Sequence, residues 1–305
     1  MLLLEQMAVL FIFILLGYIC GKLKVLPDAS AKSISWIVVN IANPALILSA
    51  SMSEDKMLQG EQLLKAFGIA ILVFVFLIII STFLPILLRV QKNDVGVFRV
   101  MTIFSNIGFM GFPVVSAAYG ETALMYASLF LFPYSILIYT YGIMAMRKKT
   151  AEHERIQWKK IFNVGVIACI LSVCLYISDV SMPTVIKTTV MDLSKLTAPL
   201  SMIVIGQSMT HFKLGKLFAD LRLMIFSVIK LILIPIVGIL LLKLMISDAM
   251  ILGVCLIMMA TPVGSMTAML AQQYDGNYEM ASRGVALTTL LSVITIPLVS
   301  FILQM

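Results

Sequence analysis

Long apolar segments separated by short polar ones run through the whole sequence. A helix needs about 20 mostly apolar residues to cross the hydrocarbon core of a bilayer. The pattern therefore predicts an all-α membrane protein with ten transmembrane helices. The predicted spans are Leu3–Gly21, Ser33–Ala50, Ala66–Leu88, Phe98–Gly120, Ala123–Met146, Ile161–Ile177, Leu193–Met209, Leu223–Met245, Met250–Gln272 and Ala281–Leu303.

The fourth segment, Phe98–Gly120, carries polar and helix-breaking residues at its centre. These include Ser105, Asn106, Gly111 and Pro113. A helix in lipid cannot leave backbone groups unpaired, because no water is present to satisfy them. We therefore predict that this span breaks inside protein or beside a water-filled cavity. Many secondary transporters hold their substrate at such broken helices.

Prolines recur at nearly constant spacing in the two halves of the chain. Pro44 and Pro199, Pro85 and Pro235, and Pro113 and Pro262 are 155, 150 and 149 residues apart. Five spans per half is an odd number, so the halves would have opposite orientations, as inverted transporter repeats do. We predict a first repeat over residues 1–147, a cytoplasmic linker over 148–160 and an inverted repeat over 161–305. For any single pair, a simple kink in a membrane helix remains the alternative.

Composition and charge support a membrane protein. The chain is 61% hydrophobic and 12% charged, with a mean hydropathy of +1.07, so a polar coat for a soluble core is missing. The net charge is +7, but the basic residues lie in short segments between apolar ones. With the N-terminus outside, sixteen basic residues fall on the inner side and five on the outer side. This bias predicts a multi-pass cell-membrane protein with both termini outside, and it disfavours nucleic acid as a partner.

A substrate site is expected where the fourth and ninth spans break. Pro113 would begin a new half-helix after Gly111-Phe112, and Pro262 would do the same after Ala260-Thr261. Proline is tolerated at a first helical position, and each helix N-terminus offers unpaired N–H groups and partial positive charge. Two such ends facing each other favour an anion. The predicted substrate-binding residues are Asn43, Ser105, Asn106, Gly111, Pro113, Thr261, Pro262 and Ser265.

Structural alternatives accompany several of these residues. Asn106 could form only an interhelical hydrogen bond, and Ser105 could face a helix interface. Asn43 could cap a carbonyl freed by Pro44 as readily as contact substrate. Lys230 lies about two turns into the eighth span, where it should face the bundle interior, pair with helix C-terminal carbonyls, or extend to the interface. It could neutralise the crossing half-helices or balance the charge of an anionic substrate.

Several chemistries have no signal in the sequence. No Asp or Glu falls in the central part of a predicted span, which disfavours sodium–proton exchangers that need buried carboxylates. No Walker loop, zinc motif or nucleophile–base arrangement is present. We therefore predict no enzyme activity, no catalytic residue, no cofactor and no metal site.

Five motifs resemble the auxin efflux carrier family of membrane permeases, which includes plant auxin carriers and bacterial dicarboxylate permeases. They lie in order along essentially the whole chain: NIANPALIL, SNIGFMGFPV, GQSM, KLILIP and TPVGSMTAMLAQQYDGNYEMASRGVALTTLLSVITIP. The resemblance implies two inverted five-helix repeats and a homodimer. It also implies a transport domain from spans 3–5 and 8–10 that moves, by an elevator-like or rocking motion, against a scaffold from spans 1, 2, 6 and 7. The substrate would bind where the fourth and ninth spans cross, near Asn106, Pro113 and Pro262.

The chain departs from the plant carriers in two respects. Its central linker is short, and Gly-Phe stands between Asn106 and Pro113 where plant members carry a second Asn. A small carboxylate is therefore favoured over auxin. The prediction is a secondary transporter of a small organic anion, such as a dicarboxylate or an auxin-like carboxylate, in the lipid bilayer. The alternatives are a non-transporting membrane ligand sensor or receptor of the same fold, and a sodium-coupled organic anion symporter.

Overall fold

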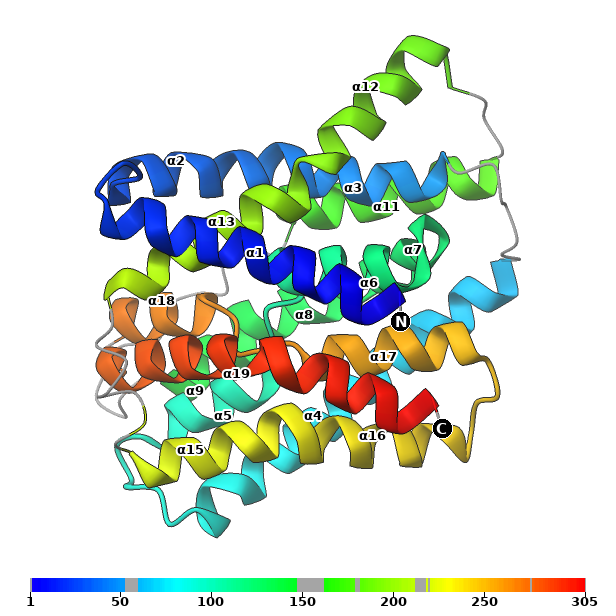
Figure 1. The fold of residues 1–305 in the computed structure, drawn as a ribbon. Helices are drawn as coiled ribbons and strands as arrows, with labels where there is room; N and C mark the ends of the chain where they lie inside the picture. Colours follow the sequence, from blue (N-terminus) through cyan, green and yellow to red (C-terminus); the bar gives the residue numbers. More distant parts are fainter. Residues whose placement is uncertain are drawn as a thin grey trace. The chain divides into compact units, whose positions relative to one another are not determined.

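The computed structural model describes residues 2–52, 60–146, 162–178, 182–211, 218, 220–274 and 276–304. The predicted linker 148–160 lies outside these residues. Within them every regular element is a helix (Figure 1), and the β structure consists of one isolated bridge between Ser105 and Val263. The prediction of an all-α fold is confirmed.

Six helices in the described residues are long and apolar enough to cross a membrane. They are Asp28–Ser51, Glu61–Leu87, Glu121–Met146, Thr184–His211, Leu221–Lys243 and Tyr278–Phe301. Shorter apolar helices occupy Ala8–Lys22, Ile107–Tyr119, Val164–Ser178 and Ala249–Ala260. Each of these helices overlaps a predicted span, while the ten-helix inverted repeat itself stays a prediction.

The chain divides into two compact units. The first comprises residues 1–67, 108–132 and 162–211. Within it α1 packs against α13, and α3 packs against α7, α11 and α12. Its helices are α1 (Leu2–Lys22), α2 (Asp28–Ile37), η1 (Val38–Ala42), α3 (Asn43–Ser51), α6 (Phe112–Tyr119), α7 (Glu121–Leu129), α11 (Val164–Ser178), α12 (Thr184–Lys195), α13 (Thr197–Ser208) and η4 (Met209–His211).

The second unit comprises residues 68–107, 133–161 and 212–305. Within it α19 packs against α5, α15, α17 and α18, and α16 packs against α17. Its helices are α5 (Val95–Ile103), η3 (Ile138–Gly142), α9 (Ile143–Met146), α15 (Leu221–Val228), η5 (Ile229–Leu233), α16 (Ile234–Lys243), α17 (Ala249–Ala260), α18 (Met266–Gln273) and α19 (Tyr278–Gln304). The chain changes unit within α4 (Gly60–Leu87), η2 (Ile107–Gly111) and α8 (Leu131–Leu137).

Aspartate and asparagine side chains cap helices of the second unit. Asp220 accepts from the backbone N–H groups of Arg222 and Leu223 at the start of α15, and Asp248 caps α17 in the same way. These carboxylates satisfy N–H groups that have no partner inside the helix. Asn277 caps α19 through Met280 and donates its amide to Asp94 over 2.8 Å. The last contact ties the start of α19 to the residue that precedes α5.

A π-helical turn precedes three of the membrane prolines. Pro44, Pro113 and Pro235 each stand second in the helix that follows such a turn. Proline donates no N–H and its ring crowds the carbonyl four residues earlier. In the wider turn, the residue before the proline bonds five residues back, as Asn43 does to Val38 and Ile234 to Ile229. The π turn thus lets the helix continue through the proline.

Two glycines allow the backbones of α1 and α13 to touch. A Cβ at Gly206 would lie 1.9 Å from the Ile14 carbonyl oxygen, and a Cβ at Gly17 would lie 2.0 Å from the Ile203 carbonyl oxygen. Small residues bring membrane helices together in this way, because dispersion contacts increase as the backbones approach. No side chain larger than hydrogen fits at either position without moving a helix.

We predict that Gly206→Ala forces α1 and α13 apart and lowers the free energy of unfolding by about 1–3 kcal/mol. The thermal unfolding midpoint of the purified protein in detergent measures the effect. Gly68→Ala on α4 is the matched control, since a Cβ there meets no heavy atom within 4 Å. Equal midpoints for the two variants would contradict the close contact.

Candidate functional site

The two broken spans pair with each other through their backbones. α5 ends at Ile103 and is followed by extended backbone at Phe104, and α17 ends before extended backbone at Thr261. The Asn106 N–H donates to the Pro262 carbonyl over 2.7 Å, and the Gly264 N–H donates to the Phe104 carbonyl over 2.9 Å. Ser105 and Val263 face each other in an antiparallel bridge. Each broken segment therefore satisfies polar groups of the other, which a membrane interior requires.

Two residues outside the predicted set support this junction. Gly264 eases the close approach of the two segments, because a Cβ there would lie 3.1 Å from the Ser105 carbonyl oxygen. Thr288 on α19 accepts from the Val263 N–H over 3.1 Å and donates to the Gly284 carbonyl over 2.7 Å. Nothing in the local sequence around Thr288 distinguishes it from Thr289, so this role has no sequence signal.

The predicted starts of the half-helices are wrong. Pro113 is the second residue of α6, and Gly111 before it is helical, because η2 runs directly into α6. The break lies earlier, over residues 104–106. Pro262 belongs to the extended segment, and α18 begins only at Met266. Pro262 is held extended because its carbonyl pairs with Asn106 and its neighbour Val263 forms the bridge.

Lys230 lies at the same junction. Its side chain is fully buried, and its ammonium donates to Ser105 Oγ over 2.7 Å and to the Met259 carbonyl over 3.5 Å. Met259 is in the last turn of α17, where helix carbonyls carry partial negative charge. The expectation that Lys230 faces the protein interior and meets helix C-terminal carbonyls is confirmed. Its role in transport stays a prediction.

The other predicted residues of the second unit differ in availability. Asn106 is buried, with 9% of its surface exposed, and its backbone N–H is part of the junction. The Thr261 hydroxyl is fully buried and donates within its own chain segment to the Met258 carbonyl over 3.0 Å. Ser265 is exposed and stands at the N-cap of α18 without a side-chain capping bond. The structure therefore brings Ser105, Asn106, Pro262 and Lys230 together and commits the Thr261 hydroxyl elsewhere.

Asn43, Gly111 and Pro113 belong to the first unit. Asn43 opens α3 with 7% of its surface exposed, and its Oδ1 is buried without a hydrogen-bond partner. Its amide nitrogen lies 3.4 Å from where a Cβ would stand on Gly108. Buried polar atoms are normally paired, and the Asn43 oxygen is one of several buried side-chain atoms in the described residues without a partner. The alternative role as a carbonyl cap has no hydrogen bond to support it among the described residues.

Residues 2–300 match the family described as membrane transport protein. The chain belongs to this family. An uncharacterized transporter of Methanothermobacter thermautotrophicus is 24% identical over 307 residues, and one of Methanocaldococcus jannaschii is 22% identical over 315 residues. Each alignment covers 98% of this chain and 98% of the relative.

Membership confirms the resemblance to auxin efflux carriers, and it identifies the protein as a transporter and not an enzyme. The apolar helices agree with a protein of the membrane. Among the described residues, no group of three or more His, Cys, Asp or Glu side chains lies together as metal ligands would.

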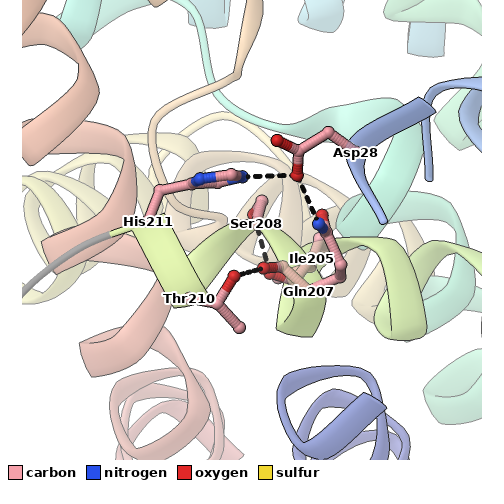
Figure 2. Close-up of polar contacts among 6 residues, drawn as sticks. All are labelled: Asp28, Ile205, Gln207, Ser208, Thr210 and His211. Atoms are coloured by element: carbon pink, nitrogen blue, oxygen red, sulfur yellow. Dashed lines mark hydrogen bonds and ion pairs between the residues drawn. The ribbon is translucent and has the colours of Figure 1, made fainter. Parts of the chain in front are cut away.

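This membrane transport protein also has a polar cluster that sequence reasoning missed. In the first unit Asp28 Oδ1 accepts from Gln207 Nε2 over 2.7 Å and contacts His211 Nε2 over 3.1 Å (Figure 2). Gln207 is 4% exposed, whereas the Asp28 side chain is largely in solvent. The cluster joins the start of α2 to the end of α13. Gln207 lies in the GQSM motif of the family resemblance, and this motif is the sequence signal that could have pointed to the cluster.

We predict that Thr288→Val weakens the junction and Thr289→Val does not. Thr288→Val leaves the buried Val263 N–H unpaired, which costs about 1–3 kcal/mol. Thr289 donates only to the Val285 carbonyl of its own helix, so its loss is smaller. Thermal unfolding of both variants in detergent tests this difference. If the Thr288→Val and Thr289→Val proteins were equally stable, the hydrogen bond between Thr288 and the Val263 N–H would not stabilise the junction.

Proposed function

We propose that the protein is a secondary transporter of a small organic anion, such as a dicarboxylate or an auxin-like carboxylate. The observation that carries this proposal is the fully buried Lys230 ammonium at the junction of the two broken spans. Its hydrogen-bond partners are a hydroxyl and a carbonyl, so no carboxylate among the described residues bonds to this amine. A buried charge in a membrane protein is costly and commonly marks a substrate or ion pathway.

The proposed arrangement has ten spans in two inverted repeats, with the substrate at the crossing of the fourth and ninth spans. The backbone pairing of residues 104–106 with residues 262–264 supports such a crossing. We take Asn106, Ser105 and Ser265 as polar contacts to substrate near this junction. In the first unit, considered by itself, we take the unpaired Asn43 oxygen as a separate candidate contact to a hydrogen-bond donor. Cell-membrane location with both termini outside, and a homodimer, complete the proposal.

We predict that proteoliposomes containing the purified protein take up a labelled organic anion. Malate, malonate and indole-3-acetate are the probes, since they span small dicarboxylates and an auxin. Uptake should saturate with concentration and compete with unlabelled anion. Vesicles without protein give the background. Movement of cations or neutral solutes only would refute an anion carrier, and saturable binding without flux would favour a membrane sensor.

Replacing external sodium with choline or potassium tests the remaining alternative, a sodium-coupled organic anion symporter. If transport is not coupled to sodium, the uptake rate should be the same with sodium, choline or potassium outside. A rate that requires sodium would support the sodium-coupled symporter.

We predict that Asn106→Ala abolishes uptake while expression and thermal stability stay close to those of the wild type. The physical reason is that its side chain, and not its backbone N–H, is assigned to the substrate. Asn40→Ala is the control, because the Asn40 amide donates only to the Trp36 carbonyl on its own helix. A large loss of stability in Asn106→Ala would instead favour a structural interhelical bond.

A further inference from the structure

Ser105 bonds to the Lys230 ammonium and directly precedes Asn106 in the chain. Ser105 Oγ accepts a hydrogen bond from the Lys230 ammonium over 2.7 Å. It makes no second hydrogen bond to another described residue. A hydroxyl can accept one hydrogen bond while donating another. The Ser105 O–H is therefore available to donate to a carboxylate bound beside Asn106. Lysine, serine and carboxylate would then form one continuous hydrogen-bonded chain.

In the part of the chain that the structure describes, no carboxylate bonds to the Lys230 ammonium. The turn that carries it, η5, packs against α15, α16, α17 and α19, and Ser105 follows α5. None of the ionisable groups on or capping these elements bonds to the Lys230 ammonium, whose partners are Ser105 and Met259. These groups are Asp94, Arg99, Asp220, Arg222, Lys243, Asp248, Cys255, Tyr278, Glu279 and Arg283.

Most of these groups lie near helix ends and have other contacts. Asp220 and Asp248 accept from backbone N–H groups, Asp94 accepts from Asn277, and Glu279 pairs with Arg283. Cys255 lies on α17 one turn before Met259 and is buried. A charged amine in this position gains a counter-ion only when an anion arrives.

We propose that Lys230 carries the proton that crosses the membrane with each substrate anion. The inference rests on the proposed function and adds its coupling ion. The proton and the anion favour each other's binding, because each supplies the charge that the other lacks, and this coupling is reciprocal. On one side the Lys230 amine takes a proton from water as the anion binds. On the other side it returns that proton to water as the anion leaves.

Transport of a monocarboxylate with one proton moves no net charge, whereas a dicarboxylate dianion with one proton moves one negative charge. A pH difference of one unit can then support about a tenfold accumulation of a monoanion. Lys230 is a positioning residue in this scheme, since it acts on the substrate through Ser105. The arginine variant separates charge from proton transfer, because a guanidinium keeps its proton under all assay conditions.

The test uses proteoliposomes loaded with a pH-sensitive dye, with the best anion from the uptake panel as substrate. In the wild type, an inward pH gradient of one unit should raise net uptake, and the lumen should acidify as the anion enters. Lys230→Arg should retain exchange of internal for external anion but lose both acidification and the response to the gradient. Ser105→Ala should weaken that response, because it breaks the link between lysine and substrate. Lys243→Arg, at the exposed end of α16, should behave like the wild type.

Each outcome bears on one proposal. Wild-type uptake without acidification would overturn Lys230 as the proton carrier even if the variants fail to fold, and so would a Lys230→Arg protein that still acidifies the lumen. Absence of any anion exchange in the wild type would refute the proposed function itself. Wild-type acidification that disappears in Lys230→Arg while anion exchange continues would support the inference.

Discussion

The need to pair every backbone polar group away from water governs the junction of the two broken segments in the second unit. Two helices stop in the middle of their spans, which exposes N–H and C=O groups where lipid offers no partner. The chain resolves this by making a short antiparallel contact between residues 104–106 and 262–264. Three residues around the contact, Gly264, Thr288 and Lys230, serve the same pairing. Gly264 lets the backbones approach, Thr288 satisfies a remaining N–H, and Lys230 meets the end of a helix.

The sequence predicted the features that depend on local composition. A run of Ser, Asn, Gly and Pro inside an apolar segment indicated a break in the fourth span, and a lone lysine in the eighth indicated an interior position. Both are properties of a single segment in lipid. The helix starts at Pro113 and Pro262 could not be predicted in this way. A π turn absorbs Pro113, and a partner far away in the chain holds Pro262 extended.

Contacts between distant segments also explain the missed residues. Asp28 and Gln207 are 179 positions apart, and Asp94 and Asn277 are 183 apart. The side chains of each pair form a hydrogen bond at helix ends. None of the four residues is unusual within its own segment of sequence. The hydrogen-bond partners of hydroxyl groups likewise cannot be predicted from the local sequence. Thr261 and Ser105 looked alike in the sequence, but Thr261 bonds to its own chain segment and Ser105 bonds to Lys230.

The π turns before Pro44, Pro113 and Pro235 have a consequence for how related sequences compare. Such a turn holds one more residue than an α-helical turn of the same height. Loss of that residue rewinds the turn and leaves the helices on either side intact, although it rotates one against the other. Evolutionary insertions and deletions of single residues inside these spans should therefore gather at the three turns, where the helix has room for a change in length.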